Sequence, residues 1–435
     1  MSLTEYLEKS PLTKFHYLIL TVGCLAYCLT AMNVMLIASV MPAVSGEWGL
    51  DETTAGLLFS AGYIGMFFGA AGCGRLADTI GRKKTLIIVV VIMSVFTAMC
   101  SIAWDVFSMG LLRFLAGIGL GGALPQPGIY ISEYVPAKHR GKFLGLTETS
   151  WVYGVLLSLL FPIFLIPTYG WRLTFLVALI PLILAPIIIF FIPESIRYLE
   201  RKGKLDEALK LFRKHGIISG SISVKRGEVY PKKISVDEVL SHQYRRRTIL
   251  LWILWAVLVY TYHGIFLWLP TIYATEFGLK LVKSLWWVFI VTIFQIPGYY
   301  AATFLLDPVG RKPVLAIFLG LAGIGSLFLS FRVELSWILL WSIVISFFNL
   351  GAWAGLYTYT PELYPTRIRG TGSGFAASVG RFAGIFAPTI TGYLYATTHL
   401  TGPFAVFALA HLLAALSIAL LGVETKRKTL EEISK

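Results

Sequence analysis

Three charged side chains stand out inside long apolar stretches of the sequence: Arg113, Glu148 and Arg381. A charge in hydrocarbon is costly, so such residues face a partner or a water-filled space and mark candidate functional sites. A guanidinium keeps its charge and can hold a carboxylate with two hydrogen bonds. Two cations against one acid therefore favour the binding of an anion. The alternative is that each charge is structural, with Arg113 and Glu148 as a static ion pair.

Small residues surround Arg381 at helical spacing, so a neighbouring helix or a solute could come close to it. They are Gly374, Ala377, Ser378 and Gly384. A carboxyl such as that of Glu148, between apolar surroundings and a nearby arginine, could load and release a proton. His263 could also titrate near neutrality, although a histidine beside aromatic residues is more often a packing residue.

The elements that must position these residues are transmembrane helices. Of the 435 residues, 57% are hydrophobic and 14% are charged, and the mean hydropathy is +0.75. A soluble domain carries about 25% charged residues. A run of about 20 apolar residues crosses the bilayer as one helix, which satisfies its own backbone groups. The runs predict an all-α membrane protein with twelve spans: 16–45, 54–77, 85–103, 106–134, 143–168, 173–192, 248–275, 284–306, 313–331, 335–360, 372–397 and 402–422.

Basic residues gather on one side of the predicted membrane. The formal net charge is +14, and most of the 37 Lys and Arg lie in the termini and in alternate loops. The opposite loops hold only Arg172, Lys280, Lys283 and Arg332. The positive-inside rule then predicts a multi-pass protein of the cell membrane with both termini in the cytoplasm. The charge reports topology, and we expect no nucleic-acid partner. We expect no cleaved signal either, because residues 1–10 are polar and the first span would direct insertion.

The chain contains an internal duplication at an offset of 229 residues. Leu76, Asp78, Gly81, Arg82, Lys83 and Leu86 recur as Leu305, Asp307, Gly310, Arg311, Lys312 and Leu315; Tyr130, Glu133, Pro136, Arg140, Gly141 and Gly145 recur as Tyr359, Glu362, Pro365, Arg369, Gly370 and Gly374. Both copies are basic, so the halves share one orientation and need an even number of spans each. The sequence predicts two parallel six-helix bundles, 1–192 and 248–435, joined by a cytoplasmic linker, 193–247, with a short amphipathic helix at 205–214.

The loop Gly74-Arg-Leu-Ala-Asp78-Thr-Ile-Gly-Arg82-Lys-Lys84, its repeat, and Arg113-Phe-Leu-Ala-Gly117-Ile-Gly-Leu-Gly-Gly122 resemble the major facilitator superfamily over essentially the whole chain. An acid such as Asp78 amid many bases can accept charge-assisted hydrogen bonds from guanidinium groups. We expect a conformation-dependent latch, with a merely solvated loop as the alternative. Its candidate residues are Asp78, Arg82, Glu133, Arg140, Asp307, Arg311, Glu362 and Arg369.

Finer motifs resemble the sugar-porter, organic-ion and synaptic-vesicle-protein-like branches. They are Pro193-Glu-Ser-Ile-Arg-Tyr-Leu199, Tyr130 to Gly141 and Pro361 to Gly370. The stretches Glu148-Thr-Ser-Trp151 and Tyr262 to Pro270 resemble bacterial nicotinate carriers of the last branch. Two departures stand out. Thr30 and Asn33 occupy the places of two first-helix acids in that branch, and Tyr260 to Gly264 replaces the glutamine-rich pattern of sugar porters.

The resemblance implies that the seventh and tenth helices line a central solute path. Aromatic rings with a few polar tips suit a flat organic solute, although each ring alone could serve packing. The candidate solute-binding residues are Arg381, Arg113, Glu148, Trp151, Tyr260, Tyr262, His263, Asn349, Trp353 and Tyr357. A helix-11 arginine takes part in solute recognition in similar organic-anion carriers.

Signatures of enzymes and of ATP use are absent from the sequence: it has no phosphate-binding Gly-x-x-x-x-Gly-Lys-Ser/Thr loop and no His-Glu-x-x-His. Cys24 and Cys28 lack further ligands for a metal, so we expect neither metal nor cofactor. The sequence predicts a monomeric secondary carrier of a small organic anion, such as nicotinate or benzoate, working by alternating access with proton symport. A sugar or polyol carrier and a non-transporting membrane sensor are the alternatives, and a membrane enzyme is the remotest one.

Overall fold

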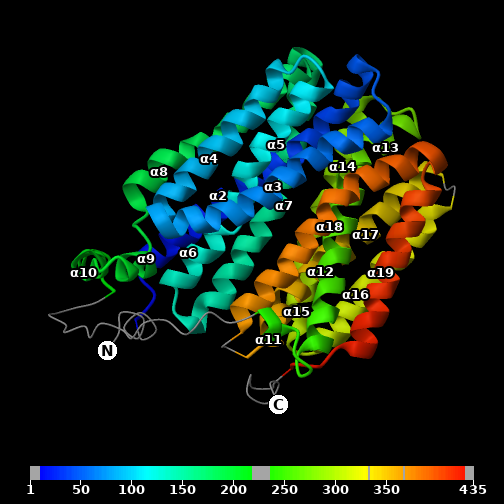
Figure 1. Cartoon of the computed structure of the whole chain (residues 1–435). Coiled ribbons are helices and arrows are strands. Elements are labelled where there is room, and N and C mark those ends of the chain that lie inside the picture. Colours follow the sequence, from blue (N-terminus) through cyan, green and yellow to red (C-terminus); the bar gives the residue numbers. More distant parts are fainter. Residues whose placement is uncertain (1–9, 218–235, 332–333, 366–367, 427–435) are drawn as a thin grey trace. The chain divides into compact units, whose positions relative to one another are not determined.

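The computed structural model describes residues 10–217, 236–331, 334–365 and 368–426, and within these residues every regular element is a helix. The first part of the chain forms α2 (Lys14–Trp48), α3 (Glu52–Ile80), α4 (Arg82–Met99), η1 (Cys100–Ile102), α5 (Val106–Ala123), α6 (Gln126–Tyr134), α7 (Ala137–Thr174), η2 (Phe175–Ile183) and α8 (Leu184–Phe191). Figure 1 shows the order of these helices along the chain.

Three short helices follow α8: α9 (Ile196–Arg201), α10 (Leu205–Lys214) and α11 (Val236–Val239). The remaining helices are α12 (Arg245–Phe266), α13 (Leu269–Thr275), α14 (Leu281–Ile293), α15 (Gln295–Leu306), α16 (Arg311–Ser330), α17 (Leu335–Glu362), α18 (Arg369–Thr398) and α19 (Thr401–Leu421). The middle of the predicted linker, 218–235, and the terminal residues 1–9 and 427–435 lie outside the described residues.

Ten helical stretches of the described chain are long and apolar enough to cross a membrane. One of them, Lys138–Phe191, has 54 residues and contains two spans, because Gly170 breaks its helix with φ 74° and ψ 174°. A twelfth crossing is α18, which has 30 residues but is less apolar and is not among the ten. The helices therefore agree with the twelve predicted spans, and several extend about one turn further at their polar ends.

Contacts between Cα atoms divide the chain into two compact units. Unit 1 comprises Met1–Leu36, Ile64–Ser158 and Arg172–Pro231, and unit 2 comprises Ile37–Tyr63, Leu159–Trp171 and Lys232–Lys435. One end each of α2, α3 and α7 thus belongs with the C-terminal helices. The division into bundles 1–192 and 248–435 stays a prediction.

In unit 1 the helices α3, α4 and α5 pack through glycines. A Cβ atom on Gly121 would overlap the carbonyl oxygen of Met66 on α3, and one on Gly119 would overlap the backbone of Met93 on α4. Small residues allow such close backbone approach, which replaces the missing hydrophobic driving force between helices in lipid. In unit 2, α16 packs against α17 and α19, and α12 packs against α18.

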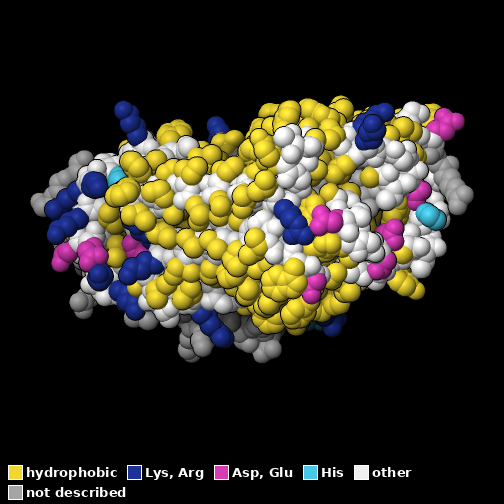
Figure 2. Space-filling view, turned by 90° about the horizontal axis from the view of Figure 1, so that it is seen from above, with side chains coloured by type: hydrophobic (Ala, Val, Ile, Leu, Met, Phe, Trp, Pro, Cys, Tyr) yellow, Lys and Arg dark blue, Asp and Glu magenta, His cyan; other side chains and the backbone are white. Residues whose placement is uncertain are grey.

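The surface is largely apolar, as Figure 2 shows for the face that it draws. Large side chains such as Phe107, Phe190 and Phe304 are each more than 70% exposed. A soluble monomer rarely exposes so much contiguous apolar surface, whereas lipid tails match it. Charged side chains lie between these apolar areas in the same view.

Replacing Gly121 by alanine should destabilise unit 1 by about 1–3 kcal/mol, because the added methyl group must push α5 away from α3. A Cβ on Gly141 of α7 meets nothing within 4 Å. Gly141→Ala is therefore the matched control and should be neutral or slightly stabilising, since alanine favours helix over glycine by about 1 kcal/mol. Thermal unfolding of the detergent-purified variants, followed by tryptophan fluorescence, measures both. Equal midpoints for the two variants would contradict the close approach.

Candidate functional site

In unit 1, Glu148 of α7 is joined to the first transmembrane helix. The hydroxyl of Tyr27 on α2 donates a hydrogen bond of 2.7 Å to Glu148 Oε2. The Tyr27 ring also packs on the ring of Trp151, with centroids 5.8 Å apart. Two predicted site residues, Glu148 and Trp151, therefore share one neighbour. Gly154, one turn further along α7, lies directly against the Cys28 carbonyl, which fixes the spacing of the two helices.

Arg113 is the second predicted charge of unit 1 and is 3% exposed on α5. A charge kept this far from solvent must be compensated by surrounding dipoles and partners. Arg113 therefore lies inside the helix bundle and does not face lipid.

In unit 2 three aromatic rings from α12 and α17 form a cluster. The Trp255 ring meets the rings of Trp353 and Tyr357 edge-on, with centroids 5.6 and 5.4 Å away, and these two lie 5.5 Å from each other. The Trp255 indole N–H donates to Thr360 Oγ1 at 3.0 Å. Edge-to-face contacts of this kind stabilise a fixed arrangement of rings. We call Trp255, Trp353 and Tyr357 the aromatic cluster.

Arg381 of α18 follows a glycine that touches this cluster. A Cβ atom on Gly380 would lie 3.3 Å from Cε3 of Trp255 and 2.9 Å from Cγ2 of Val259. Along the face of Arg381 itself the surroundings differ: Gly384 is pressed against Val259, whereas a Cβ on Gly374 would meet nothing within 4 Å. Arg381 is partly exposed. Of the small residues predicted around it, Gly374 and Ser378 are exposed, whereas Gly384 is buried.

The other predicted residues of α12 point in several directions. Tyr262 is buried, and its hydroxyl donates to Gln295 Oε1 on α15 at 3.3 Å. Tyr260 packs its ring on Phe407 of α19, 5.8 Å away, on a different side of α12 from the aromatic cluster. His263 hydrogen-bonds through Nδ1 to the Val259 carbonyl at 2.9 Å, and its ring meets Tyr63 of α3 at 4.8 Å.

Asn349 is fully buried in a polar network that joins three helices. Its Nδ2 donates to Thr261 Oγ1 on α12 at 3.1 Å and to His411 Nε2 on α19 at 2.9 Å. His411 Nδ1 lies 2.9 Å from the Phe407 carbonyl, so it carries the ring proton and Nε2 accepts. Buried hydrogen bonds of this kind orient the side chains that they join.

Within unit 2, the first part of α3, up to Tyr63, packs tightly against α18. The Ser60 hydroxyl lies 2.6 Å from the Ile385 carbonyl and 2.7 Å from Thr389 Oγ1. A Cβ on Gly56 would lie 2.8 Å from the Pro388 carbonyl oxygen. No solute fits between helices at such contacts, so these must separate if a solute passes here.

The predicted latch residues form local clusters in each copy of the repeat. In the first copy, Arg82 Nε lies 2.8 Å from Glu133 Oε1, and Glu133 is 4% exposed. Arg140 hydrogen-bonds to the Val135 carbonyl at 3.2 Å, while Asp78 is exposed. An ion pair in this partly buried setting fixes α4 to α6.

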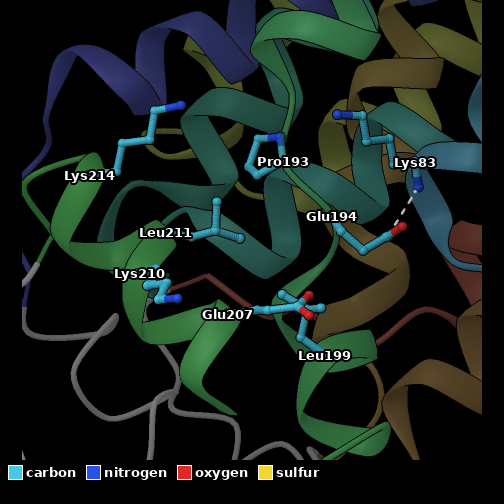
Figure 3. Close-up of a pocket in the computed structure, with 8 residues that line it drawn as sticks. All are labelled: Lys83, Pro193, Glu194, Leu199, Glu207, Lys210, Leu211 and Lys214. Atoms are coloured by element: carbon cyan, nitrogen blue, oxygen red, sulfur yellow. Dashed lines mark hydrogen bonds between the residues drawn. The ribbon is translucent and has the colours of Figure 1, made fainter. Parts of the chain in front are cut away.

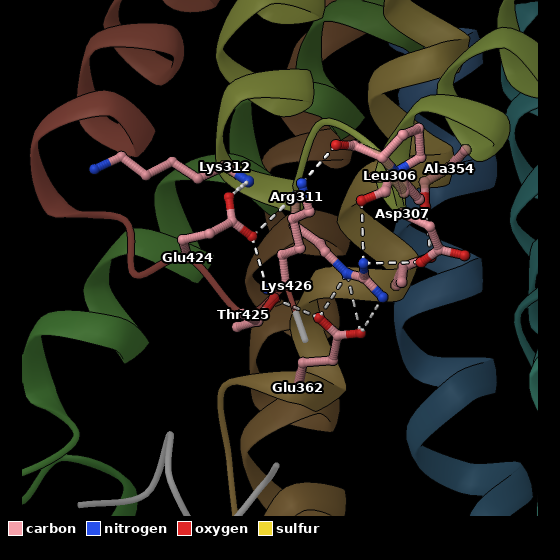
Figure 4. Close-up of polar contacts among 11 residues, drawn as sticks. Leu306, Asp307, Arg311, Lys312, Ala354, Glu362, Glu424, Thr425 and Lys426 are labelled. Carbon is pink, nitrogen blue, oxygen red and sulfur yellow. Dashed lines mark hydrogen bonds and ion pairs between the residues drawn. The ribbon is translucent and has the colours of Figure 1, made fainter. Parts of the chain in front are cut away.

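The second copy repeats this arrangement, as Figure 4 shows. Arg311 bonds Glu362 through Nη2 at 3.1 Å and Asp307 through Nη1 at 3.0 Å. Arg369, the counterpart of Arg140, hydrogen-bonds to the Tyr364 carbonyl at 3.4 Å. Both arginines of the repeat therefore hold a glutamate from the end of a later helix.

A second acid, absent from the predicted set, completes each cluster. Glu424 accepts the backbone N–H groups of Arg311 and Lys312 at 3.0 and 3.1 Å, at the start of α16. Glu194 accepts those of Arg82 and Lys83 at 2.8 and 3.1 Å, at the start of α4. The first amides of a helix have no acceptor within the helix itself. They lie at the positive end of the helix dipole, where a carboxylate is stabilising.

Comparison with known proteins fits this architecture. The pattern of the Major Facilitator Superfamily matches residues 23–388 and 284–435. The chain belongs to this superfamily. It is 39% identical to the niacin transporter NiaP of Acinetobacter baylyi over 438 residues, covering all of both chains. It is 27% identical to the benzoate transport protein of the same species, covering 91% of this chain and 86% of that protein.

Among solved structures, a D-xylose–proton symporter superposes with a TM-score of 0.76, covering 95% of this chain and 99% of the other. At 21% identity this likeness establishes the fold alone. The predicted family and the all-α membrane fold are confirmed. This major facilitator protein is thus a multi-pass membrane transporter of a small organic solute and not an enzyme.

Several residues that contact the predicted site residues were not predicted from the sequence. Glu194 and Glu424 are 230 residues apart, one more than the repeat offset, so the ungapped comparison does not align them. The first lies in the quoted Pro-Glu-Ser motif, whose repeat reads Val423-Glu-Thr. Tyr27, Trp255 and His411 sit in apolar runs where aromatic residues are usually packing, and no spacing signal distinguishes them.

Replacing Glu424 by alanine should destabilise the chain by about 1 kcal/mol, because two amides at the start of α16 lose their acceptor. Glu334→Ala is the matched control, since this exposed acid precedes α17 but makes no side-chain capping bond. Thermal unfolding midpoints in detergent compare the two. A control variant as unstable as Glu424→Ala would show that the capping bonds contribute nothing specific.

Proposed function

We propose that this chain carries a small aromatic monocarboxylate, such as nicotinate or benzoate, across the membrane by alternating access together with a proton. The observation that carries the proposal is the packing of α18 against the aromatic cluster in unit 2, where Gly380, the residue before Arg381, lies against Trp255. A flat aromatic acid presents both a carboxylate for a guanidinium and a ring for aromatic neighbours. The names of the two relatives support the same solute class.

The direction of the carboxylate follows from the geometry around Arg381. Gly384 is packed against Val259, whereas Gly374 has open space beside it. We therefore propose that an anion approaches Arg381 from the Gly374 side. Arginine suits this role better than lysine, because its planar fork binds both carboxylate oxygens at once and it cannot lose its charge. Arg113 and Glu148, both in unit 1, would balance charge during the cycle.

For topology we propose that both termini face the cytoplasm, as the distribution of basic residues predicts. The two clusters around Arg82 and Arg311 then lie at the cytoplasmic ends of their helices. We propose that they act as latches whose strength differs between the two states of the carrier, because a ligand shifts only an equilibrium in which contacts differ.

Uptake of radiolabelled nicotinate and benzoate into proteoliposomes tests the solute class. Arg381→Ala should lower uptake roughly 10-fold to 100-fold, because a charge-assisted hydrogen bond contributes about 1.5–3 kcal/mol. Arg381→Lys should recover part of it, having charge without the bidentate fork. The control is Lys280→Ala, which removes an exposed cation in the loop before α14 and should transport normally. A wild-type carrier that takes up neither acid would refute the solute class.

Proton coupling is tested at Glu148. In Glu148→Gln, accumulation driven by a pH gradient should disappear while solute exchange at equal pH persists, because the amide keeps the size but cannot exchange a proton. Tyr27→Phe removes only the hydrogen bond to Glu148 and should weaken coupling less. If Glu148→Gln still accumulates solute along a pH gradient, a group other than Glu148 carries the proton.

A polyol carrier is the second candidate, and two buried amides favour it. Among the described residues, Asn349 Oδ1 and Gln295 Nε2 have no hydrogen-bond partner, and such groups could read hydroxyls. This candidate predicts competition by xylose and no effect of Arg381→Ala. The uptake assay above therefore separates the two proposals.

A further inference from the structure

A pocket of about 380 Å³ lies between α10 and the start of α4, as Figure 3 shows. Three lysines line it: Lys83 from α4, and Lys210 and Lys214 from α10. Its apolar wall includes Leu199 and Leu211. All these residues belong to unit 1.

The two acids in the lining are already engaged. Glu194 accepts the backbone amides of Arg82, Lys83 and Ser195, the last at 2.9 Å. Glu207 is paired with Lys204, whose Nζ lies 2.8 Å from its Oε1. The lining holds three lysines against these two carboxylates, and Glu207 is also paired with Lys204 from outside the lining, so the pocket carries a net positive charge.

The positions of the lysines are fixed by packing. On α10, Ala208 and Phe212 are fully buried against unit 1, and His215 stacks on Phe15 with centroids 4.0 Å apart. Lys210 and Lys214 are four residues apart, so both extend from the same helix face. Lys83 Nζ donates to the Ile189 carbonyl at 2.7 Å, which holds the third ammonium at the edge of α8.

The end of α8 at this edge is apolar and exposed. Ile189, Phe190 and Phe191 at the end of α8 are 47%, 76% and 57% exposed. A basic pocket next to an exposed apolar helix matches a phospholipid, which has an anionic phosphate above hydrocarbon chains. A free phosphate ion would use only the lysines. The pocket and its apolar border together therefore favour the lipid.

We propose that this pocket binds the phosphate headgroup of an anionic phospholipid. Lys210 and Lys214 contact the phosphate, Lys83 faces it from α4, and the acyl chains lie along the exposed end of α8. The bound lipid would join α10 to the membrane-spanning helices. This proposal does not depend on the transported solute.

Binding is measured on the full-length, detergent-purified protein by native mass spectrometry and by thermal unfolding in the presence of phosphatidylglycerol. In Lys210→Gln/Lys214→Gln the dissociation constant should rise about 30-fold, since each basic residue near an anionic surface contributes roughly a factor of five. Both side chains are exposed, so the fold should survive the change. Phosphatidylcholine should raise the unfolding midpoint of neither protein.

The matched control is Lys202→Gln/Arg213→Gln, which removes the same charge from exposed positions of the same segment outside the pocket lining. It should change the dissociation constant less than about twofold. Equal losses in both double variants would overturn the site in favour of unspecific charge attraction. Equal protection by phosphatidylcholine would overturn the anionic preference. Protection by millimolar inorganic phosphate alone, lost in Lys210→Gln/Lys214→Gln, would overturn the lipid in favour of a free anion.

Discussion

The first backbone amides of a helix that starts near the membrane surface need an acceptor, because no earlier residue of the helix can supply one. At the start of α16 Glu424 is that acceptor, and the arginine whose amide it accepts also binds Glu362 from α17. One short stretch of chain thus joins three segments. Gly310 makes this possible: with φ +119°, it lacks the Cβ that would lie 2.6 Å from the Glu424 carboxylate. The same solution appears at Gly81 and Glu194.

These clusters differ physically from the charges deeper in the helices. Arg311 has carboxylate oxygens of Asp307 and Glu362 within hydrogen-bond distance, so its charge is compensated by the protein in this conformation. Arg381 lies between a blocked and an open side of its own helix. In the proposed site the solute approaches Arg381 from the open side.

The sequence predicted the ends of the spans to within about two turns, because hydrocarbon thickness and backbone satisfaction leave few alternatives. The internal duplication pointed to the residues of the clusters around Arg82 and Arg311, because identical residues at a constant spacing can be recognised from the sequence alone. The sequence could not show which neighbouring helix each side chain faces. Tyr260 and Tyr262 looked equivalent in an apolar run, yet one packs on α19 and the other bonds Gln295. The Tyr27–Glu148 bond joins residues 121 apart in sequence and leaves no local pattern.

The proposed site would be selective because a solute must present two chemically different groups, a carboxylate for Arg381 and a ring for the aromatic cluster. A guanidinium alone attracts any anion, and an aromatic cluster alone attracts any flat apolar molecule. Because Gly380 brings α18 against Trp255, the cation and the rings are attached to helices whose spacing is fixed by that contact. A solute with a carboxylate but no ring, or a ring but no carboxylate, would satisfy one half only. Desolvating the guanidinium without replacing its water is costly, so a neutral ring would gain little. An aromatic acid is the simplest molecule that meets both demands.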